Sequence, residues 1–378
     1  MQPTGGRRKK GRSRYSGFEE DRGVEAHRLV LSSSPHIRER ITTRSIMFQV
    51  ILALMPVTIY SVVIHGVHAF YILFFSVAGA LLGEYMVQVV RRVRVTLDDG
   101  SAFLTGLLLA LTLPPHLPAW IAFVGGLVAT TLGKQVFGGL GHNVFNPALV
   151  GRAVVFVSWA SHMAAGYARS AQIGLASTST HRLIEKAVDV ANGATPLAAM
   201  KIVYDPSTSA LGSAGVPKGI QASTYYKPLL LANPWGCLGE VSAILLIIGG
   251  LYLVATRIID WRIPVFYVGT VAVLTAIVGR DPLFYVLAGG LLIGAIYMAT
   301  DYVTSPLAHG GRIIYAIGLG VVTWLMRFWS NNPEGVMFSI LFMNGLTPII
   351  DRYIFPHGYA RGRAKGRAGE GEGKKGKS

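Results

Sequence analysis

A series of long apolar stretches, separated by short polar or charged segments, constrains this chain more than any other feature. About ten can be counted, near residues 46–65, 67–90, 101–113, 118–136, 147–166, 237–256, 263–279, 283–300, 313–328 and 335–355. Most approach the roughly 20 residues that a helix needs to cross the hydrocarbon core of a membrane. With 51% hydrophobic and 14% charged residues, the chain is too apolar for a soluble domain. The sequence predicts an all-α polytopic membrane protein with about ten transmembrane helices.

Polar breaks occur at comparable places in the two halves of the predicted bundle. The third stretch ends early, at Leu113-Pro114-Pro115, and follows the polar segment Asp98 to Ser101. The eighth stretch ends in a polar run, Ala299 to Pro306. Interrupted helices at matching positions are typical of transporters built as inverted repeats, with a ligand site between the halves. We therefore expect a 5+5 inverted repeat with broken helices, and we expect Asp99 and Asp301 to lie near an ion or ligand site.

The apolar stretches divide the chain into five regions. Two membrane halves, residues 46–166 and 237–355, are separated by a long polar loop, residues 167–236. The N-terminal tail, residues 1–45, carries 11 Lys and Arg against 5 Asp and Glu, and the C-terminal tail, residues 356–378, carries 7 against 2. Basic segments of this kind are typical of the cytoplasmic side of a membrane.

The basic residues between the apolar stretches predict the topology. With the N-terminus inside, ten spans place one set of basic residues on the cytoplasmic face together with the C-terminal tail: Arg91, Arg92, Arg94, Lys134, Arg257, Arg262 and Arg312. This distribution follows the positive-inside rule. We expect a multi-pass protein of the bacterial cytoplasmic (inner) membrane, with both termini in the cytoplasm and residues 167–236 on the outer face. The charged N-terminus indicates no cleavable signal sequence, so the first helix would direct insertion.

Two further features narrow the possible partners. The chain has one cysteine, Cys237, which excludes an internal disulfide or an all-cysteine metal or iron–sulfur site within this chain. The basic C-terminal tail has no aromatic residue after Tyr359 to stack on bases, so we do not expect nucleic acid as a partner. Tails that lie near anionic lipid or an acidic partner fit the composition better.

The long polar loop contains the most informative motif, Asp189-Val190-Ala191-Asn192-Gly193-Ala194-Thr195-Pro196-Leu197. Gly193 and Ala194 let the backbone approach a bulky group, which leaves the hydroxyl of Thr195 free to carry it. This pattern indicates a covalently held cofactor. Alone, the Thr195-Pro196 pair is also typical of a helix start, with Thr as the capping residue and Pro in the first turn.

A second glycine-rich segment, Gly138 to Pro147, opens the fifth stretch. Its glycines, including Gly139 and Gly141, do not have the spacing of a dinucleotide-binding fingerprint, and the segment follows a helix rather than a strand. Backbone N–H groups at such a helix start, together with Asn143 and Asn146, could face an anion or a ring system. A tight connection between two helices explains the segment equally well.

Taken together, these segments resemble the D subunit of the Rnf electron-transport complex over about residues 30–355. The resemblance rests on Ser33 to Ile37, Thr42 to Met47, Asp99 to Ala102 with Thr105 and Gly106, Leu113 to Pro115, Gly138 to Pro147, Ala194 to Leu197, Gly239, Glu240, Ala299 to Asp301, Pro333 to Gly335, Asn344, Pro348 and Asp351. The same family contains the B subunit of the sodium-pumping NADH:quinone oxidoreductase.

The resemblance implies a membrane electron carrier that holds FMN through a phosphoester to Thr195, with Asp189, Asn192, Gly193 and Ala194 forming the attachment signature. The family signature usually has Ser or Thr where this chain has Asn192. Asn keeps a hydrogen-bonding side chain, so attachment is still expected. Relatives also hold a non-covalent riboflavin among the membrane helices, which makes riboflavin a second expected cofactor.

The resemblance further implies that electrons pass between ferredoxin and NAD⁺ through partner iron–sulfur and flavin subunits, coupled to transport of Na⁺ or H⁺. It assigns no catalytic residue or metal ligand to this chain. Tyr302 stands where the family commonly has Pro, which affects the geometry of the turn at the end of the eighth stretch.

Two other functions stay open. One is the quinone-reducing B-type subunit of the same family. The other is a channel or secondary transporter with the same inverted-repeat architecture and no redox group, which would explain the helices and breaks but not the segment around Thr195.

Overall fold

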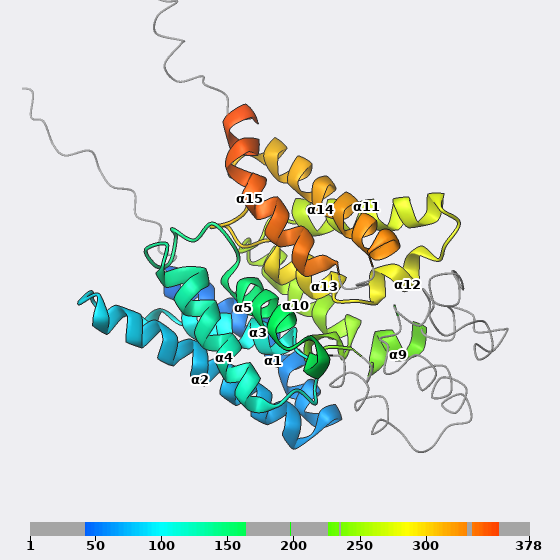
Figure 1. The fold of residues 1–378 in the computed structure, drawn as a ribbon. Coiled ribbons are helices and arrows are strands. Elements are labelled where there is room, and N and C mark those ends of the chain that lie inside the picture. The colour runs from blue at the N-terminus through cyan, green and yellow to red at the C-terminus, as the bar shows by residue number, and fades with distance from the viewer. Residues whose placement is uncertain (1–41, 164–196, 198–225, 234–235, 331–334, 355–378) are drawn as a thin grey trace, which may run out of the picture. The chain divides into compact units, whose positions relative to one another are not determined.

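The computed structural model describes residues 42–163, 197, 226–233, 236–330 and 335–354, and they form helices joined by turns (Figure 1). They all lie within one compact unit, Ile41–Ser378. Each of the ten predicted apolar stretches contains a helix, which confirms the all-helical class. Three described helices are long and apolar enough to cross a membrane: α1 (Thr43–His65), α2 (Val67–Val90) and α14 (His309–Trp329). The number ten for the spans stays a prediction.

The first half of the bundle follows the predicted stretches closely. After α1 and α2 come η1 (Leu97–Asp99), α3 (Ser101–Leu111), α4 (Ala119–Thr130), η2 (Thr131–Gln135) and α5 (Pro147–Ser158). Helix α3 is short, as the Pro114-Pro115 pair predicts, because proline cannot continue a helix.

Small residues let α2 pack tightly against its neighbours α3 and α4 (Figure 1). A Cβ atom added at Gly79 would collide with the carbonyl oxygen of Phe123, and one added at Gly126 would collide with that of Ser76. The hydroxyl of Ser76 donates to the carbonyl of Gly106 on α3 over 2.8 Å. Such close backbone approach with side-chain hydrogen bonds is how helices associate where water does not drive packing.

The second half contains several short elements and two long helices, α14 and α15. Its described elements are α9 (Tyr226–Leu231), η5 (Leu238–Glu240), α10 (Ala243–Ala255), α11 (Arg262–Ile277), α12 (Pro282–Leu287), α13 (Leu291–Ile293), η6 (Gly294–Met298), α14 and α15 (Val336–Ile354). Helices α11 and α14 lie against each other (Figure 1). They are joined by a 2.6 Å hydrogen bond between the hydroxyls of Tyr267 and Thr323, both fully buried.

The predicted stretch 283–300 is not one continuous helix. A turn at Gly289 and Gly290, whose φ values are +72° and +67°, separates α12 from α13, and α13 continues directly into η6. Glycine adopts this left-handed conformation without the steric cost that other residues pay, so the pair ends α12 and allows α13 to start in a new direction.

Two π-helical segments occur among the described helices, one in the fourth apolar stretch and one in the eighth. Helix α4 runs into η2, and α13 runs into η6; each π-helix is followed by a polar turn that the sequence analysis singled out. π-Helical turns are rare and are frequent at functional sites. These two turns position the site described next.

The outer surface of α1 suits a hydrocarbon environment. Its side chains Phe48, Leu52, Ile59 and Val63 are between 49% and 72% exposed. A soluble protein would not leave so continuous an apolar surface in contact with water. This surface supports the assignment as a multi-pass membrane protein.

Candidate functional site

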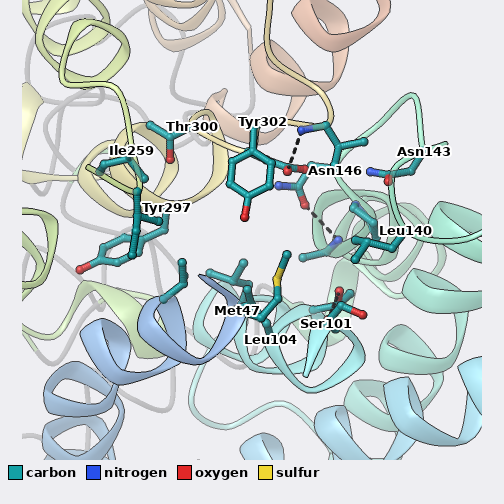
Figure 2. Close-up of a pocket in the computed structure, with 18 of the residues that line it drawn as sticks. Met47, Ser101, Leu104, Leu140, Asn143, Asn146, Ile259, Tyr297, Thr300 and Tyr302 are labelled. Carbon is teal, nitrogen blue, oxygen red and sulfur yellow. Dashed lines mark hydrogen bonds between the residues drawn. The ribbon is translucent and has the colours of Figure 1, made fainter. Parts of the chain in front are cut away.

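A small cavity lies where α1, α3, η2, α5 and η6 meet, and its volume is about 80 Å³ (Figure 2). Apolar side chains such as Met47, Leu104 and Ile259 form much of its wall. Nine polar side chains also line it: Ser101, Thr105, Lys134, Asn143, Asn146, Tyr297, Thr300, Asp301 and Tyr302. An apolar wall with a few convergent polar groups is typical of a small-molecule site.

Asn143 reaches this cavity with one polar atom unused. The residue is 4% exposed, its Nδ2 donates to the carbonyl of Phe145 over 3.2 Å, and its Oδ1 has no hydrogen-bond partner among the described residues. A buried acceptor without a donor costs free energy, so a bound ligand that donates a hydrogen bond would stabilise this arrangement. The sequence analysis predicted Asn143 as a site residue, and the structure places it in the cavity wall.

The loop before α5 delivers Asn143 to the cavity. Gly138, Gly139 and Gly141 adopt φ values of +121°, +103° and +91°, so the chain turns where other residues would be strained. Gly139 and Gly141, both predicted site residues, do not line the cavity themselves; Leu140, which lies between them, does. The glycines therefore shape the loop, and its side chains face the cavity (Figure 2).

Asn146 has two structural roles. Its Oδ1 accepts from the backbone N–H groups of Ala148 and Leu149, which makes it the N-cap of α5. Its Nδ2 donates to the carbonyl of Met298 over 3.2 Å and so joins this loop to η6. The Gly138 to Pro147 segment therefore connects two helices tightly, and it also lines a cavity; the binding of an anion or ring system there stays a prediction.

Asp301 lines the same cavity from the other half of the chain. Its Oδ1 accepts from the backbone N–H of Val303 over 3.2 Å, and its Oδ2 accepts from the hydroxyl of Thr304 over 3.4 Å. Both carboxylate oxygens thus shape the turn after η6. Tyr302, the next residue, points its ring toward the cavity (Figure 2).

A buried ionic network adjoins the cavity at Lys134. The Nζ atom of Lys134 lies 2.8 Å from both carboxylate oxygens of Glu84 and 2.5 Å from the hydroxyl oxygen of Ser101. Lys134 is 1% exposed and Glu84 is fully buried. Gln88 and Gln135 each donate to Glu84 Oε1 over 3.0 Å. A buried ion pair persists only when its members are paired and hydrogen-bonded, and here both conditions hold.

Asp99 belongs to this network rather than to the cavity wall. Its Oδ1 accepts from the hydroxyl of Ser101 over 2.5 Å and from the backbone N–H of Ser101 over 2.7 Å, which also caps the start of α3. The structure therefore places Asp301 in the cavity wall. Asp99 does not line the cavity, but it hydrogen-bonds to Ser101, which does.

Sequence reasoning treated Lys134 as a charge at the cytoplasmic face, and the structure corrects this. The residue is part of η2 and its ammonium group is paired inside the bundle, so it adds no charge to a surface loop. The available signal was a lysine inside the apolar stretch 118–136 and an acid, Glu84, inside another. Charges within membrane segments usually face one another.

Comparison with known proteins adds to this geometry. A model of the NQR2, RnfD, RnfE family matches residues 30–360, which is most of the chain. The chain belongs to this family.

Three curated relatives support the same assignment over nearly their full lengths. A Clostridium ljungdahlii protein, named as the D subunit of a proton-translocating ferredoxin:NAD(+) oxidoreductase complex, is 40% identical over 88% of this chain and 96% of its own. An Acetobacterium woodii protein, named as the D subunit of the Na(+)-translocating counterpart, is 40% identical over 86% and 93%. A Stutzerimonas stutzeri protein, named as the D subunit of an ion-translocating oxidoreductase complex, is 38% identical over 87% and 95%.

In this family member, the predicted flavin-attachment residues lie outside the described residues: Asp189, Asn192, Gly193, Ala194 and Thr195. Leu197, two residues after Thr195, is described. Its side chain is 2% exposed and belongs to a small apolar cluster with Leu229 of α9 and with Phe284, Tyr285 and Ala288 of α12 and the turn that follows.

Arg327 of α14 holds the turn beside that cluster, and sequence reasoning did not identify it. Its guanidinium donates to the carbonyls of Tyr285, Ala288 and Gly289, the last two over 2.9 and 3.1 Å. The side chain is 3% exposed. A positive charge thus stabilises the carbonyls that the end of α12 leaves without helical partners. The signal in the sequence was a single arginine inside the apolar stretch 313–328.

Proposed function

We propose that this chain is the D-type membrane subunit of an ion-translocating ferredoxin:NAD⁺ oxidoreductase, the Rnf complex. The observation that carries the proposal is 40% identity, over nearly complete chains, to two proteins named as the D subunits of such complexes. Its partners are then the other membrane and peripheral subunits of the complex, which supply the iron–sulfur and flavin centres, together with the lipid bilayer. The proposal includes no nucleic acid among these partners.

In this proposal FMN is attached covalently to Thr195. The motif from Asp189 to Leu197 supports attachment by its small residues and free hydroxyl. Leu197, two residues further along the chain, is buried in the apolar cluster at the α9 and α12 end of the bundle. Two residues of extended chain span at most about 7 Å, so a group on Thr195 would be tethered near that end. FMN supplies electron transfer in one-electron or two-electron steps.

A non-covalent riboflavin is proposed for the cavity near Asn143. The polar set fits a flavin ring, since Asn143 Oδ1 can accept a hydrogen bond and the hydroxyl of Tyr302 can donate one, within an apolar wall. The volume of about 80 Å³ is smaller than the roughly 300 Å³ at which ligand pockets begin. Binding would therefore require lining side chains, such as Tyr302 and Met47, to move.

Ion coupling is proposed at the same meeting of the two halves. Asp99 precedes α3 and Asp301 follows η6, at the third and the eighth apolar stretch, which are equivalent positions in a 5+5 inverted repeat. Broken helices at such places bind substrate or cation in inverted-repeat transporters. The two relatives at 40% identity carry different ions in their names, protons in one and Na⁺ in the other.

The proposed topology places ten spans in the cytoplasmic membrane, with both termini inside and residues 167–236 outside. The exposed arginines Arg92 and Arg257 at the ends of α2 and α10 support it, because both would face the cytoplasm. The FMN on Thr195 would then lie on the outer side.

A test of FMN attachment compares the wild type with Thr195→Ala in the complex co-expressed with a flavin transferase. In-gel ultraviolet fluorescence of the denatured chain and peptide mass spectrometry should show an FMN-sized addition on Thr195 in the wild type alone. Thr180→Ala, in the same loop, is the matched control and should retain the fluorescence. An unmodified wild-type peptide, despite active transferase, would overturn the attachment and favour the transporter alternative.

The quinone-reducing B-type subunit is the second candidate within the family. The assignment as the D-type subunit predicts that the purified complex transfers electrons between ferredoxin and NAD⁺. Reduction of quinone by NADH, without ferredoxin activity, would identify the B type instead.

A further inference from the structure

A second, larger cavity lies between the turn that joins α10 to α11 and the start of α14. Its volume is about 450 Å³. Three arginines from separate segments line it, Arg257, Arg262 and Arg312, together with His309. The hydroxyl-bearing residues Thr300, Tyr302 and Ser305 complete the polar part of its wall.

Positive charge exceeds negative charge in this wall. Asp260 is its one acidic residue, and the Asp260 Oδ2 accepts from Arg312 Nη1 over 2.7 Å and from Arg262 Nη1 over 3.1 Å. Burial alone would raise the pKa of Asp260, but the backbone N–H of Arg262 and the two guanidinium groups outweigh this effect and lower it. The carboxylate is therefore ionised at neutral pH, and one negative charge faces three positive ones.

Arg257 is the least constrained of the three arginines. Its side chain makes no hydrogen bond or ion pair with any residue that the structure describes, and its backbone φ of +58° is unusual for a residue with a side chain. Holding a non-glycine residue in the left-handed region costs free energy, which the surrounding turn must supply. The turn thus directs an unpartnered guanidinium to the cavity.

The start of α14 contributes backbone N–H groups beside the cavity. No acidic residue lies in its first turn and no side chain caps its N-terminus, while Asp351 of α15 accepts from the backbone N–H of Leu307 just before it and partly neutralises this helix end. The chain there reads His309-Gly310-Gly311-Arg312. The N-terminus of a helix carries partial positive charge and free N–H groups, which favour an anion nearby.

The surroundings of the cavity are apolar and aromatic. Trp261, over which the Arg262 guanidinium stacks at 5.5 Å, is 50% exposed, and Val265 and Leu307 are 56% and 62% exposed. Tryptophan and arginine side by side are typical of the depth at which lipid headgroups meet the hydrocarbon region. An anion at this place would sit at headgroup depth.

We propose that this cavity binds a phosphate group through Arg257, Arg262 and Arg312. Planar guanidinium groups match phosphate oxygens in pairs, and several together give both affinity and orientation. The phosphate can be that of an anionic phospholipid headgroup or of free phosphate. The volume admits the phosphate together with the atoms that carry it, and basic pockets between membrane helices bind such headgroups.

The cavity is distinct from the site near Asn143 but shares a wall with it. Ile258, Ile259, Thr300 and Tyr302 line both. The phosphate site stands whether or not a flavin binds next to it, because none of its three arginines lines the smaller cavity.

The test measures binding to the purified complex by native mass spectrometry, with added phosphatidylglycerol, phosphatidylcholine of the same acyl chains, or inorganic phosphate. Wild type should retain phosphatidylglycerol over phosphatidylcholine. Arg257→Gln should weaken this binding roughly fivefold to tenfold, and Arg257→Lys should restore most of it, because a positive charge is retained. Arg92→Gln is the matched control, since Arg92 is also an exposed arginine with positive φ but lines neither cavity.

Inorganic phosphate distinguishes the two sources. If phosphate displaces phosphatidylglycerol at millimolar concentration, the site recognises the phosphate group itself; if phosphatidylglycerol binds without competition, the site requires the lipid. Arginine-dependent binding of phosphate alone would assign a free-phosphate site. The proposal would be overturned if the Arg257→Gln variant bound phosphatidylglycerol and inorganic phosphate as well as the Arg92→Gln variant does.

Discussion

At the scale of single residues, this protein buries charged side chains inside its helical bundle, where the loss of hydration costs free energy. Lys134 and Glu84 are fully paired inside the bundle, next to a cavity that Lys134 also lines. Removing one member of a buried pair leaves an uncompensated charge, whereas removing both does not. Substituting one or both of these residues therefore tests how much the ion pair stabilises the first half of the bundle.

Glu84→Gln should lower the free energy of unfolding by about 3–5 kcal/mol, because the Lys134 ammonium would keep its charge without a counter-charge. The double variant Glu84→Gln with Lys134→Met should recover much of this loss. Thermal unfolding of the purified complex in detergent measures both. Losses that simply add in the double variant would contradict the pairing in this structure.

Two asparagines in one loop are expected to behave differently. Asn146→Ala removes the N-cap of α5 and should cost about 0.5–2 kcal/mol of stability. Asn143→Ala removes one hydrogen bond, to the Phe145 carbonyl, and an acceptor that has no partner among the described residues, so it should cost about 0.5–1.5 kcal/mol and also reduce the non-covalent flavin retained after purification. Flavin extraction and melting curves of the two variants test this contrast. Equal riboflavin content in Asn143→Ala and wild type would remove Asn143 from the proposed site.

At the scale of elements, broken and π-helical segments bring the two halves of the chain to a common cavity. The loop before α5 is joined to η6 by Asn146, and the turn after α12 is held by Arg327 from α14. In both cases a side chain from one element satisfies a carbonyl at the end of another. Helix ends inside a membrane need such partners because water is absent.

The turn between α12 and α13 should tolerate no side chain at Gly289. A Cβ there would lie 2.8 Å from Leu197 Cδ2 and 3.0 Å from Arg327 Nη2, and the φ of +72° disfavours alanine. Gly289→Ala should therefore lower stability by about 1–3 kcal/mol.

Gly269→Ala in α11 is the matched control for this substitution. Nothing lies within 4 Å of an added Cβ there, and the residue is helical, so alanine should be neutral or stabilising by up to about 1 kcal/mol. Melting temperatures of the two variants give the comparison. Similar losses in both would mean that the Gly289 turn is not constrained as described.

At the scale of the whole molecule, the predicted topology can be tested because the chain has one cysteine. Cys237 is buried and its sulfur accepts from Arg152 at 3.7 Å, so Cys237→Ser keeps an acceptor while removing the thiol. In that background, Thr180→Cys should react with a membrane-impermeant maleimide in intact cells, and Ser378→Cys should react only after lysis. The reverse pattern would overturn the proposed orientation.

Much of the architecture could be predicted from the sequence, and the reason is physical. In a membrane, long apolar stretches must form helices that satisfy their own backbone, so the helical class and the positions of α1, α2 and α14 follow from composition. The early end of α3 follows from Pro114 and Pro115, and the cap of α5 from Asn146-Pro147. Asn143, Asn146 and Asp301 could be predicted as site residues because they are polar side chains in breaks between apolar stretches.

The tertiary structure decided which residues meet. The sequence places Glu84 and Lys134 fifty residues apart in separate apolar stretches, and only packing of α2 on α4 brings them together. Arg327 likewise reaches the α12 turn, and the arginines of the larger cavity converge from the α10–α11 turn, the start of α11 and the first turn of α14. Hydrophobic length determines that helices form, because that constraint is local. The pairing of charges and the placement of cavities depend on which helices touch, and that depends on shape and hydrogen bonding across the whole fold.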